Sequence, residues 1–309
     1  MTYIVLLVGL GLIVLGADWL VDGASAIARK AGVSQFVIGL TIVGFGTSSP
    51  ELVVSLTGAI QGSADIAVGN VVGSNIFNVL FILGVTALIK PILMTEENRR
   101  KDIPITLGVS LLLVLCSIGG SLTRLEASLY LLLFAAYIYY CFKGGAGAGE
   151  TEVQDDKPVN IFRSVVFVLL GLAGLVFGGD LFVDSATEVA KQLGVSDKFI
   201  AVTVLAGGTS LPELATCIVA AAKGKDALAL GNILGSNVFN ILFILGCSGL
   251  VLPLSMASMT NVDFTMLILS VVLLLIWAFT GKRCRLDRWE AVLMLLCFAA
   301  YYIILFNRL

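Results

Sequence analysis

Two short motifs place a carboxylate beside hydroxyl groups inside long apolar segments. Residues 46–51 read GTSSPE and residues 208–213 read GTSLPE, so that Glu51 and Glu213 end the two motifs. Carbonyl, hydroxyl and carboxylate oxygens, without thiolate or imidazole, are the ligands of hard cations such as Ca²⁺ and Na⁺. A carboxylate at membrane depth is costly to keep and marks a functional site. Two facing glutamates would neutralise one divalent ion.

The two motifs belong to an internal duplication with a constant offset of 162 residues. Aligning residues 41–84 with residues 203–246 gives 22 identities in 44 positions, too many for two apolar stretches to share by accident. The chain is therefore a duplicated protein, and each half carries one glutamate of the pair.

A proline in each motif predicts a break in the helix. Pro50 and Pro212 have no N–H, so the carbonyls of Gly46 and Gly208, four residues earlier, lose their helical donor. Irregular backbone at membrane depth is tolerated only inside protein or beside a watery cavity. We expect the break to gather carbonyls, the two carboxylates and the hydroxyls of Thr47, Ser48, Thr209 and Ser210.

The same residues also fit a purely structural role. Ser48 and Glu51, like Ser210 and Glu213, have the S-x-x-E spacing of a capping box, with proline in the first turn. Such a box would only restart a kinked helix. Both glutamates lie well inside predicted apolar spans, where a mere cap is expensive, so we favour ion binding.

A second polar cluster, G-N-x-x-G-S-N-x-F-N, occurs at 69–78 and 231–240. We favour ion contact for Ser74, Asn78, Ser236 and Asn240. Two roles fit the other asparagines of this cluster, ion contact or hydrogen bonding between helices. These asparagines are Asn70, Asn75 and their mates Asn232 and Asn237. The glycines four residues apart predict close helix packing in membranes; they are Gly69, Gly73, Gly231 and Gly235.

Composition and hydropathy indicate a polytopic membrane protein. The chain is 58% hydrophobic and 13% charged, with a mean hydropathy of +1.03, whereas soluble domains carry about 25% charged residues. No basic segment precedes the first apolar run, so we interpret that run as a true span. We predict ten spans, near 3–22, 36–60, 66–89, 103–119, 126–142, 161–183, 199–222, 227–251, 263–280 and 288–306.

A polar linker divides these spans into two sets of five. Residues 143–160 are rich in glycine and charge, between a first repeat, 1–142, and a second, 161–309. An odd number of spans in each half forces the second half to be inverted, a recurring plan of secondary transporters. The predicted fold is an all-α integral membrane protein of two inverted five-helix repeats with broken helices at the ion site. Four repeated aspartates fall at the ends of spans 1 and 6, where we expect them to be solvated or capping: Asp18, Asp22, Asp180 and Asp184.

The distribution of basic residues predicts the orientation. Of the 19 Lys and Arg residues, 15 lie in the loops after the odd-numbered spans and 4 on the other face. By the positive-inside rule, both termini lie outside and the central linker is cytoplasmic. Because the basic residues are confined to loops, nucleic-acid binding has no support.

The cysteines and the absence of histidine argue against catalysis. The six cysteines include no C-x-x-C pair, and five lie in apolar spans as small buried hydrophobes. The chain has no histidine, which excludes imidazole proton relays and Ser-His-Asp catalysis. We therefore expect neither an enzyme nor a bound cofactor.

The paired motifs and the ten spans resemble the sodium/calcium exchangers of the calcium/cation antiporter superfamily, in a minimal prokaryotic form. The resemblance covers essentially the whole chain. It implies alternating-access antiport of Ca²⁺ against Na⁺ in the plasma membrane, with spans 1 and 6 sliding across the bundle. It assigns Ca²⁺ coordination to Glu51 and Glu213. It places the other ligands at Gly44, Thr47, Ser48, Ala206, Thr209 and Ser210, and on the following helices at Ser74, Asn78, Ser236 and Asn240.

One departure from that family concerns residue 240. It is Asn here, where some members, including potassium-dependent ones, have Asp, and this argues against potassium co-transport. A proton-driven exchanger of Ca²⁺ or another divalent cation and a passive cation channel are the alternatives. The expected partners are the two ions as substrates and the lipid bilayer, with no nucleic acid and no obligate protein partner.

Overall fold

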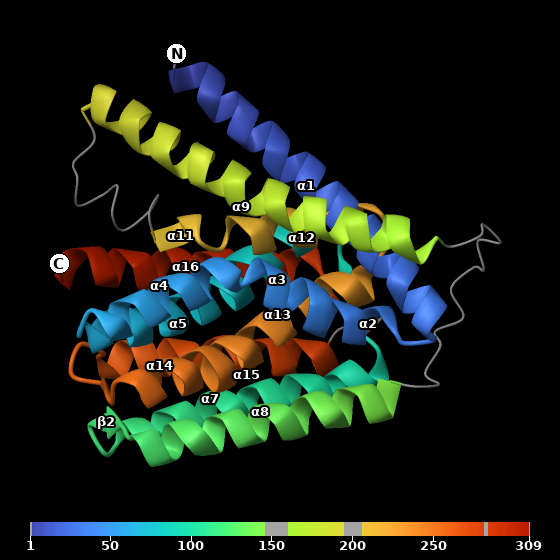
Figure 1. Ribbon diagram of the computed structural model, residues 1–309. Helices are drawn as coiled ribbons and strands as arrows, with labels where there is room; N and C mark the ends of the chain where they lie inside the picture. Colours follow the sequence, from blue (N-terminus) through green and yellow to red (C-terminus); the bar gives the residue numbers. More distant parts are fainter. Residues whose placement is uncertain (1, 146–159, 195–205, 281–283, 309) are drawn as a thin grey trace.

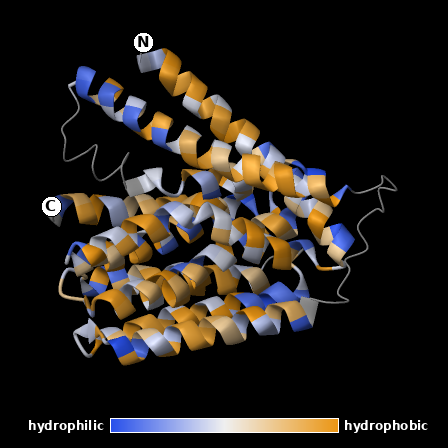
Figure 2. Cartoon of the chain, in the orientation of Figure 1, coloured by the Kyte–Doolittle hydropathy of each residue, from blue (hydrophilic) through white to orange (hydrophobic). Residues whose placement is uncertain are grey.

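The computed structural model describes residues 2–145, 160–194, 206–280 and 284–308, which form a helical bundle (Figure 1). Two long helices, α1 (Thr2–Ala31) and α9 (Ile161–Gln192), lie across one side of the other helices. Apolar residues run along nearly every helix (Figure 2). Most of the predicted linker and the predicted start of the seventh span at residue 199 lie outside the described residues.

Seven described helices are long and apolar enough to cross a membrane, or eight if the bent pair Gln35–Thr47 and Ser49–Ile60 forms one span. Two further predicted spans contain shorter helices, the 15-residue α7 (Ile103–Ser117) and the 12-residue α12 (Leu211–Ala222). The seven are Thr2–Ala31, Ala64–Ile89, Arg124–Lys143, Ile161–Gln192, Asp226–Val251, Asn261–Thr280 and Arg288–Asn307.

Helices α1 and α9 extend beyond the apolar segments predicted as the first and sixth spans. Helix α1 continues past residue 22 to Ala31, and α9 continues past residue 183 to Gln192. Hydropathy falls at these points, but alanine, lysine, arginine and glutamate favour helix, so the helix continues into the polar segment. The four repeated aspartates consequently lie inside helices and not at their ends.

Two segments at the centre of the bundle repeat the same structure. The first is α5 (Ala64–Ile76), η2 (Phe77–Ile82) and α6 (Leu83–Ile89), and the second is α13 (Asp226–Val238), η5 (Phe239–Ile244) and α14 (Leu245–Val251). In both, η is a π-helical turn inside a continuous apolar helix. Their most apolar windows are 72% and 94% buried. Such π turns often mark functional sites, and the sequence analysis did not predict them.

Glycine permits close backbone contact in the second of these segments. A Cβ at Gly231 would collide with the backbone of Phe36 in α2 (Gln35–Ile38), and a Cβ at Gly235 would collide with Leu40 in η1 (Gly39–Val43). The expected close packing is therefore confirmed for this pair. For the equivalent pair, Gly69 and Gly73, the positions that match Phe36 and Leu40 are 198 and 202, which lie outside the described residues. The expected close packing stays a prediction there.

Helices α1 and α9 pack backbone to backbone as one unit. A Cβ at Gly16 would lie 2.7 Å from the Gly171 carbonyl oxygen, and a Cβ at Gly171 would lie 2.6 Å from the Leu20 nitrogen. Gly9 is equally close to Phe182, at 2.8 Å from its nitrogen. Small residues that let two helices approach in this way are typical of membrane helix pairs.

The remaining helices surround the central segments. They are α7, α8 (Arg124–Gly145), α15 (Asn261–Thr280) and α16 (Arg288–Arg308). Two short antiparallel strand pairs join the two halves at the helix ends, β1 (Ile92–Leu93) with β4 (Arg285–Leu286) and β2 (Ser121–Leu122) with β3 (Leu254–Ser255). Large apolar side chains are exposed on the outside, among them Leu115, Leu132 and Leu296, as a surface in contact with lipid requires.

Candidate ion-binding site

Both helices break at the predicted motifs. Helix α3 (Gly44–Thr47) ends at Ser48, and α4 (Ser49–Ile60) begins directly after it with a bend of 48°. In the second half, α11 (Ala206–Gly208) precedes the turn at Ser210, and α12 starts at Leu211. The break is where proline removes a backbone donor. The structural prediction for both motifs is confirmed.

Ser49 supplies the hydrogen-bond donor that Pro50 removes. Its Oγ donates to the Gly46 carbonyl at 2.7 Å, and that carbonyl is the one that lacks its helical N–H partner. The equivalent residue of the second motif is Leu211, which has no hydroxyl. The difference between Ser49 and Leu211 therefore affects only the backbone at the first break.

The serine hydroxyls contact the glutamate of the other half and do not cap their own helix. Ser48 Oγ donates to Glu213 Oε1 at 2.9 Å, and Ser210 Oγ donates to Glu51 Oε1 at 3.0 Å. Neither serine side chain makes a capping hydrogen bond, although each is the N-cap residue. Glu51 is 1% exposed and Glu213 is fully buried. The capping-box interpretation of these hydroxyls is therefore wrong, and the crossed contacts bring both carboxylates into one site.

Four buried carboxylate and amide oxygens of the candidate ligands have no hydrogen-bond partner among the described residues. Two are the second carboxylate oxygens of the glutamates and two are amide oxygens, and each residue is at most 1% exposed. A buried polar atom without a partner costs about 1–3 kcal/mol, so such atoms call for an explanation. A cation bound by oxygen would supply it. The atoms are Glu51 Oε2, Glu213 Oε2, Asn78 Oδ1 and Asn240 Oδ1.

Two further asparagines hold those amides in place. Asn75 Oδ1 accepts from Asn240 Nδ2 at 3.0 Å, and Asn237 Oδ1 accepts from Asn78 Nδ2 at 3.1 Å. Asn75 and Asn237 also donate to each other's backbone carbonyl, at 3.1 and 3.3 Å. With each Nδ2 engaged, the amide oxygens of Asn78 and Asn240 are left without a partner. Of the two roles left open for Asn75 and Asn237, the structure gives hydrogen bonding between helices.

The other pair of asparagines also bonds between helices. Asn70 Nδ2 donates to the Glu51 carbonyl at 3.0 Å and to Ser55 Oγ at 2.9 Å. Asn232 Oδ1 accepts from Thr47 Oγ1 at 3.1 Å. Each therefore connects a central helix to one of the broken segments.

The structure places the remaining candidates around the same breaks. Ser236 Oγ donates to the Gly44 carbonyl at 3.3 Å. Thr209 Oγ1 has no partner among the described residues, and Ser74 is buried, with 4% of its surface exposed. Ala206 begins α11.

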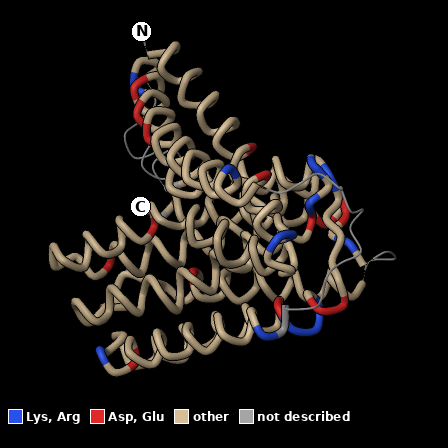
Figure 3. The backbone as a smooth tube through the Cα atoms, turned by 45° about the vertical axis from the view of Figure 1, so that its right-hand side comes forward, with Lys and Arg blue, Asp and Glu red and all other residues tan. Residues whose placement is uncertain are grey.

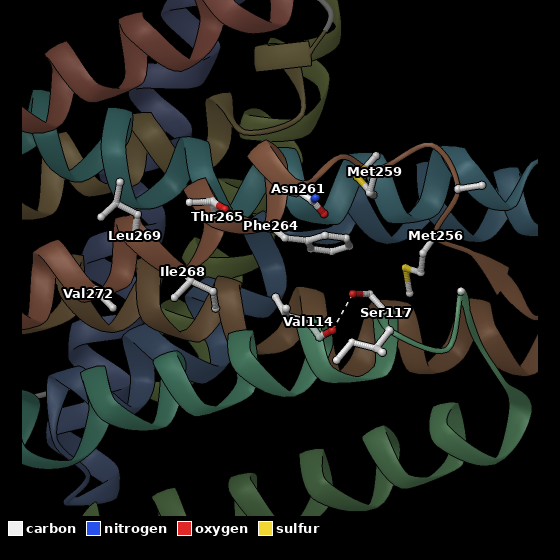
Figure 4. A pocket seen from close by; sticks show the side chains of 13 residues that line it. Val114, Ser117, Met256, Met259, Asn261, Phe264, Thr265, Ile268, Leu269 and Val272 are labelled. Carbon is white, nitrogen blue, oxygen red and sulfur yellow. Dashed lines mark hydrogen bonds between the residues drawn. The ribbon is translucent and has the colours of Figure 1, made fainter.

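A cavity of about 640 Å³ reaches two of the candidate ligands. Ser74 and Thr209 line it together with Asn70, and it extends to Asp65 and Asp263. The sequence analysis did not identify these two aspartates, because neither lies in a repeated motif. A different cavity, of about 780 Å³, lies between α7 and α15 (Figure 4), and none of its lining residues carries a charge. It offers nothing to neutralise a cation.

Among the described residues, no group of three or more His, Cys, Asp or Glu side chains is placed to hold a metal ion. The candidate site is instead two carboxylates with neutral oxygens, a donor set suited to a hard cation. The fold and the site thus define a helical membrane protein with a buried pair of carboxylates, a candidate cation site, shared between two duplicated halves.

Comparison with known proteins gives the family. The family model described as sodium/calcium exchanger protein matches residues 1–143 and 163–307. Sodium/calcium exchanger MaX1 of Methanosarcina acetivorans is 35% identical, with 98% of each chain covered, and inner membrane protein YrbG of Escherichia coli is 37% identical over 80% of this chain and 79% of its own. A solved structure of the sodium-calcium exchanger NCX_Mj, soaked with Na⁺ and Ca²⁺, aligns with a TM-score of 0.84 and 33% identity, covering 98% of this chain and 96% of that one. The chain belongs to the sodium/calcium exchanger family, whose members are multi-pass membrane antiporters and not enzymes.

Proposed function

We propose that the protein is a secondary active antiporter that exchanges Ca²⁺ for Na⁺ across the plasma membrane by alternating access. The observation that carries the proposal is the pair of crossed contacts, Ser48 with Glu213 and Ser210 with Glu51. They hold two buried carboxylates so that one oxygen of each has no partner among the described residues. Two negative charges in a low-dielectric site match one divalent cation, since the attraction between charges is far stronger there than in water.

The proposed architecture is ten transmembrane helices in two inverted repeats, residues 1–142 and 161–309, joined by a linker at 143–160. Its support is the 162-residue sequence offset together with the matching α5–η2–α6 and α13–η5–α14 segments. Basic residues gather toward one end of the molecule (Figure 3). This supports the orientation that the positive-inside rule predicts, in which that end is cytoplasmic and both termini lie outside.

The proposed ion ligands come from both repeats. The glutamates supply the charge, the amides of Asn78 and Asn240 supply neutral oxygens, and the hydroxyls and carbonyls of the two breaks complete the shell. Na⁺ and Ca²⁺ share these oxygens as alternative substrates, and the proposal includes no cofactor and no protein partner besides the lipid bilayer. The complete set is Glu51, Glu213, Gly44, Thr47, Ser48, Ala206, Thr209, Ser210, Ser74, Asn78, Ser236 and Asn240.

The test is Ca²⁺ uptake into proteoliposomes of the purified protein. We expect uptake to be driven by an outward Na⁺ gradient, and to be absent with choline in place of Na⁺. Uptake driven equally well by a pH gradient without Na⁺ would replace this function by proton-coupled exchange. Ca²⁺ flux without any counter-ion would indicate a channel.

A further inference from the structure

Three ion pairs join helix α1 to the turn between α12 and α13. Lys223 Nζ lies 2.7 Å from Asp18 Oδ1 and 2.8 Å from Asp22 Oδ1, and Lys225 Nζ lies 3.3 Å from Asp22 Oδ1. Lys223 also donates to the Asp18 carbonyl at 3.3 Å. We call these four residues the ion-pair cluster. Their burial is partial, with 27% of the Lys223 side chain and 46% of each aspartate side chain exposed.

The ionisation of Lys223 reflects this arrangement. Partial burial acts to lower its pKa, but the hydrogen bonds to Asp18 and Asp22 and their negative charges outweigh burial and raise the pKa above its usual value. The lysine is therefore held in its charged form by the two aspartates of α1.

The cluster lies where the α1 and α9 unit packs on the other helices. Helices α1 and α9 form one unit through glycine contacts, and that unit lies across the other helices. At the C-terminal end of α1 the unit lies close to α2 and α12, whereas the N-terminal end of α1 and the Gln192 end of α9 extend away from the other helices (Figure 1). Between these ends, α9 packs on both broken segments, with Leu172 against Gly46 and Val183 against Gly208. The cluster thus adds charge contacts to the end of the unit that is packed on the bundle.

The internal duplication repeats the aspartates of the ion-pair cluster but not its lysines. At the offset of 162 residues, Asp18 and Asp22 correspond to Asp180 and Asp184, so both halves carry the aspartates. Lys223 and Lys225 correspond to Gln61 and Ser63, so only the second half carries the cations. In the part of the chain that the structure describes, Asp180 and Asp184 are exposed and form no ion pair.

We propose that the ion-pair cluster of Asp18, Asp22, Lys223 and Lys225 is a conformational device that stabilises the state closed at the Lys223 end. The inference rests on the alternating access of the proposed function. In an inverted repeat, one access state becomes the other when the two halves exchange conformations. The equivalent contact in that second state would join Asp180 and Asp184 to Gln61 and Ser63, which carry no charge. The cluster therefore favours one state and not the other.

The ion-pair cluster is partly exposed to solvent, and this limits how far it shifts the equilibrium between the two access states. Single ion pairs at a surface contribute little, and a network of several charges contributes more. We expect removal of both lysines to change the ratio of the two states by about threefold, a modest shift for a two-state equilibrium.

The test measures the two states directly. Spin labels are placed on cysteines substituted at Thr57 and Gln192, which are exposed on α4 and α9, in a background without other accessible cysteines. Pulsed EPR distances in nanodiscs then report whether the end of the molecule that carries Gln61, and not the Lys223 end, is open (long distance) or closed (short distance). We expect Lys223→Gln with Lys225→Ser to increase the short-distance population relative to the long one by about threefold. Asp18→Asn with Asp22→Asn removes the same ion pairs from the other side and should give the same shift.

Two comparison variants make the test specific. Gln61→Lys with Ser63→Lys supplies the missing cations opposite Asp180 and Asp184, and it should also increase the short-distance population. Lys30→Gln removes an exposed cation near the end of α1 that belongs to no ion pair among the described residues, and it should leave the populations as in the wild type. The proposal is overturned if the double lysine variant matches the wild type while Na⁺/Ca²⁺ exchange is intact. A different result would instead overturn the proposed function. That result is one and the same spin-label distance in all variants and ion conditions, together with no Na⁺/Ca²⁺ exchange.

Discussion

Ser210 in the second half donates its hydroxyl hydrogen to Oε1 of Glu51 in the first, at 3.0 Å. The mirror contact, from Ser48 to Glu213, is 2.9 Å long. Each carboxylate is therefore positioned by the opposite repeat, and neither half contains a complete site. The site exists only while the two broken segments face each other, which connects ion binding to the arrangement of the repeats.

We expect Glu51→Gln and Glu213→Gln each to abolish Ca²⁺ exchange. Either substitution leaves a divalent ion with a single negative charge in a buried site, where charge neutralisation matters most. The amide still offers one oxygen and nearly the same volume, so the protein should elute from a sizing column in detergent as the wild type does. Na⁺-driven Ca²⁺ uptake into proteoliposomes is the measurement.

A matched control for these variants is Glu290→Gln. Glu290 is also fully buried, and its Oε2 accepts from the Asp287 N–H at the start of α16. It is outside the candidate site, so this variant should exchange Ca²⁺ at a near-normal rate. Near-normal exchange by Glu51→Gln or Glu213→Gln would exclude a site with two required carboxylates.

Na⁺ and Ca²⁺ should compete for the site. Among the described residues that form it, the two glutamates are the only charged side chains, so both ions must use the same oxygens. Isothermal titration of Ca²⁺ at rising Na⁺, with choline holding the ionic strength constant, should show the apparent Ca²⁺ affinity falling steadily. An unchanged Ca²⁺ affinity at saturating Na⁺ would require separate sites and contradict this mechanism.

The breaks in the two helices could be predicted from sequence because their cause is local. Pro50 removes one donor from a fixed carbonyl, and the offset of 162 residues identifies the same event at Pro212. The crossed hydroxyl contacts could not be predicted in the same way. The spacing of Ser48 and Glu51 fits a cap equally well, and only the packing of the two halves decides which glutamate a serine meets.

The lengths of α1 and α9 could not be predicted from hydropathy either. Hydropathy marks where a segment stops being apolar, while Asp22 and the residues after it continue the helix outside that limit.

The contact at Gly235 predicts an effect on stability. Gly235→Ala would place a methyl group against the backbone of Leu40, and overpacking of this kind costs about 1–3 kcal/mol. The control is Gly108→Ala in α7, which meets no described atom within 4 Å, and replacing a helical glycine with alanine stabilises by about 0.5–1 kcal/mol. Thermal unfolding in detergent should show a lower midpoint for Gly235→Ala and an unchanged or higher one for Gly108→Ala. Equal midpoints would show that α13 is free to move away from η1.

The last prediction concerns Asn240, whose Nδ2 donates to Asn75 Oδ1 at 3.0 Å while its own Oδ1 has no partner among the described residues. With asparagine at both 78 and 240, two carboxylates balance one Ca²⁺, and wild-type exchange should be indifferent to K⁺. In Asn240→Asp, an oxygen replaces the donor facing Asn75, and the Ca²⁺-loaded site gains one excess negative charge if the new group ionises. The aspartate must then take up a proton or recruit a monovalent cation. Exchange by this variant should therefore depend more on pH or on K⁺ than wild-type exchange does. Asn261→Asp, in the separate cavity between α7 and α15, is the control and should keep the wild-type profile. K⁺ dependence in the wild type, or an Asn240→Asp profile identical to it, would show that residue 240 does not contact the ions.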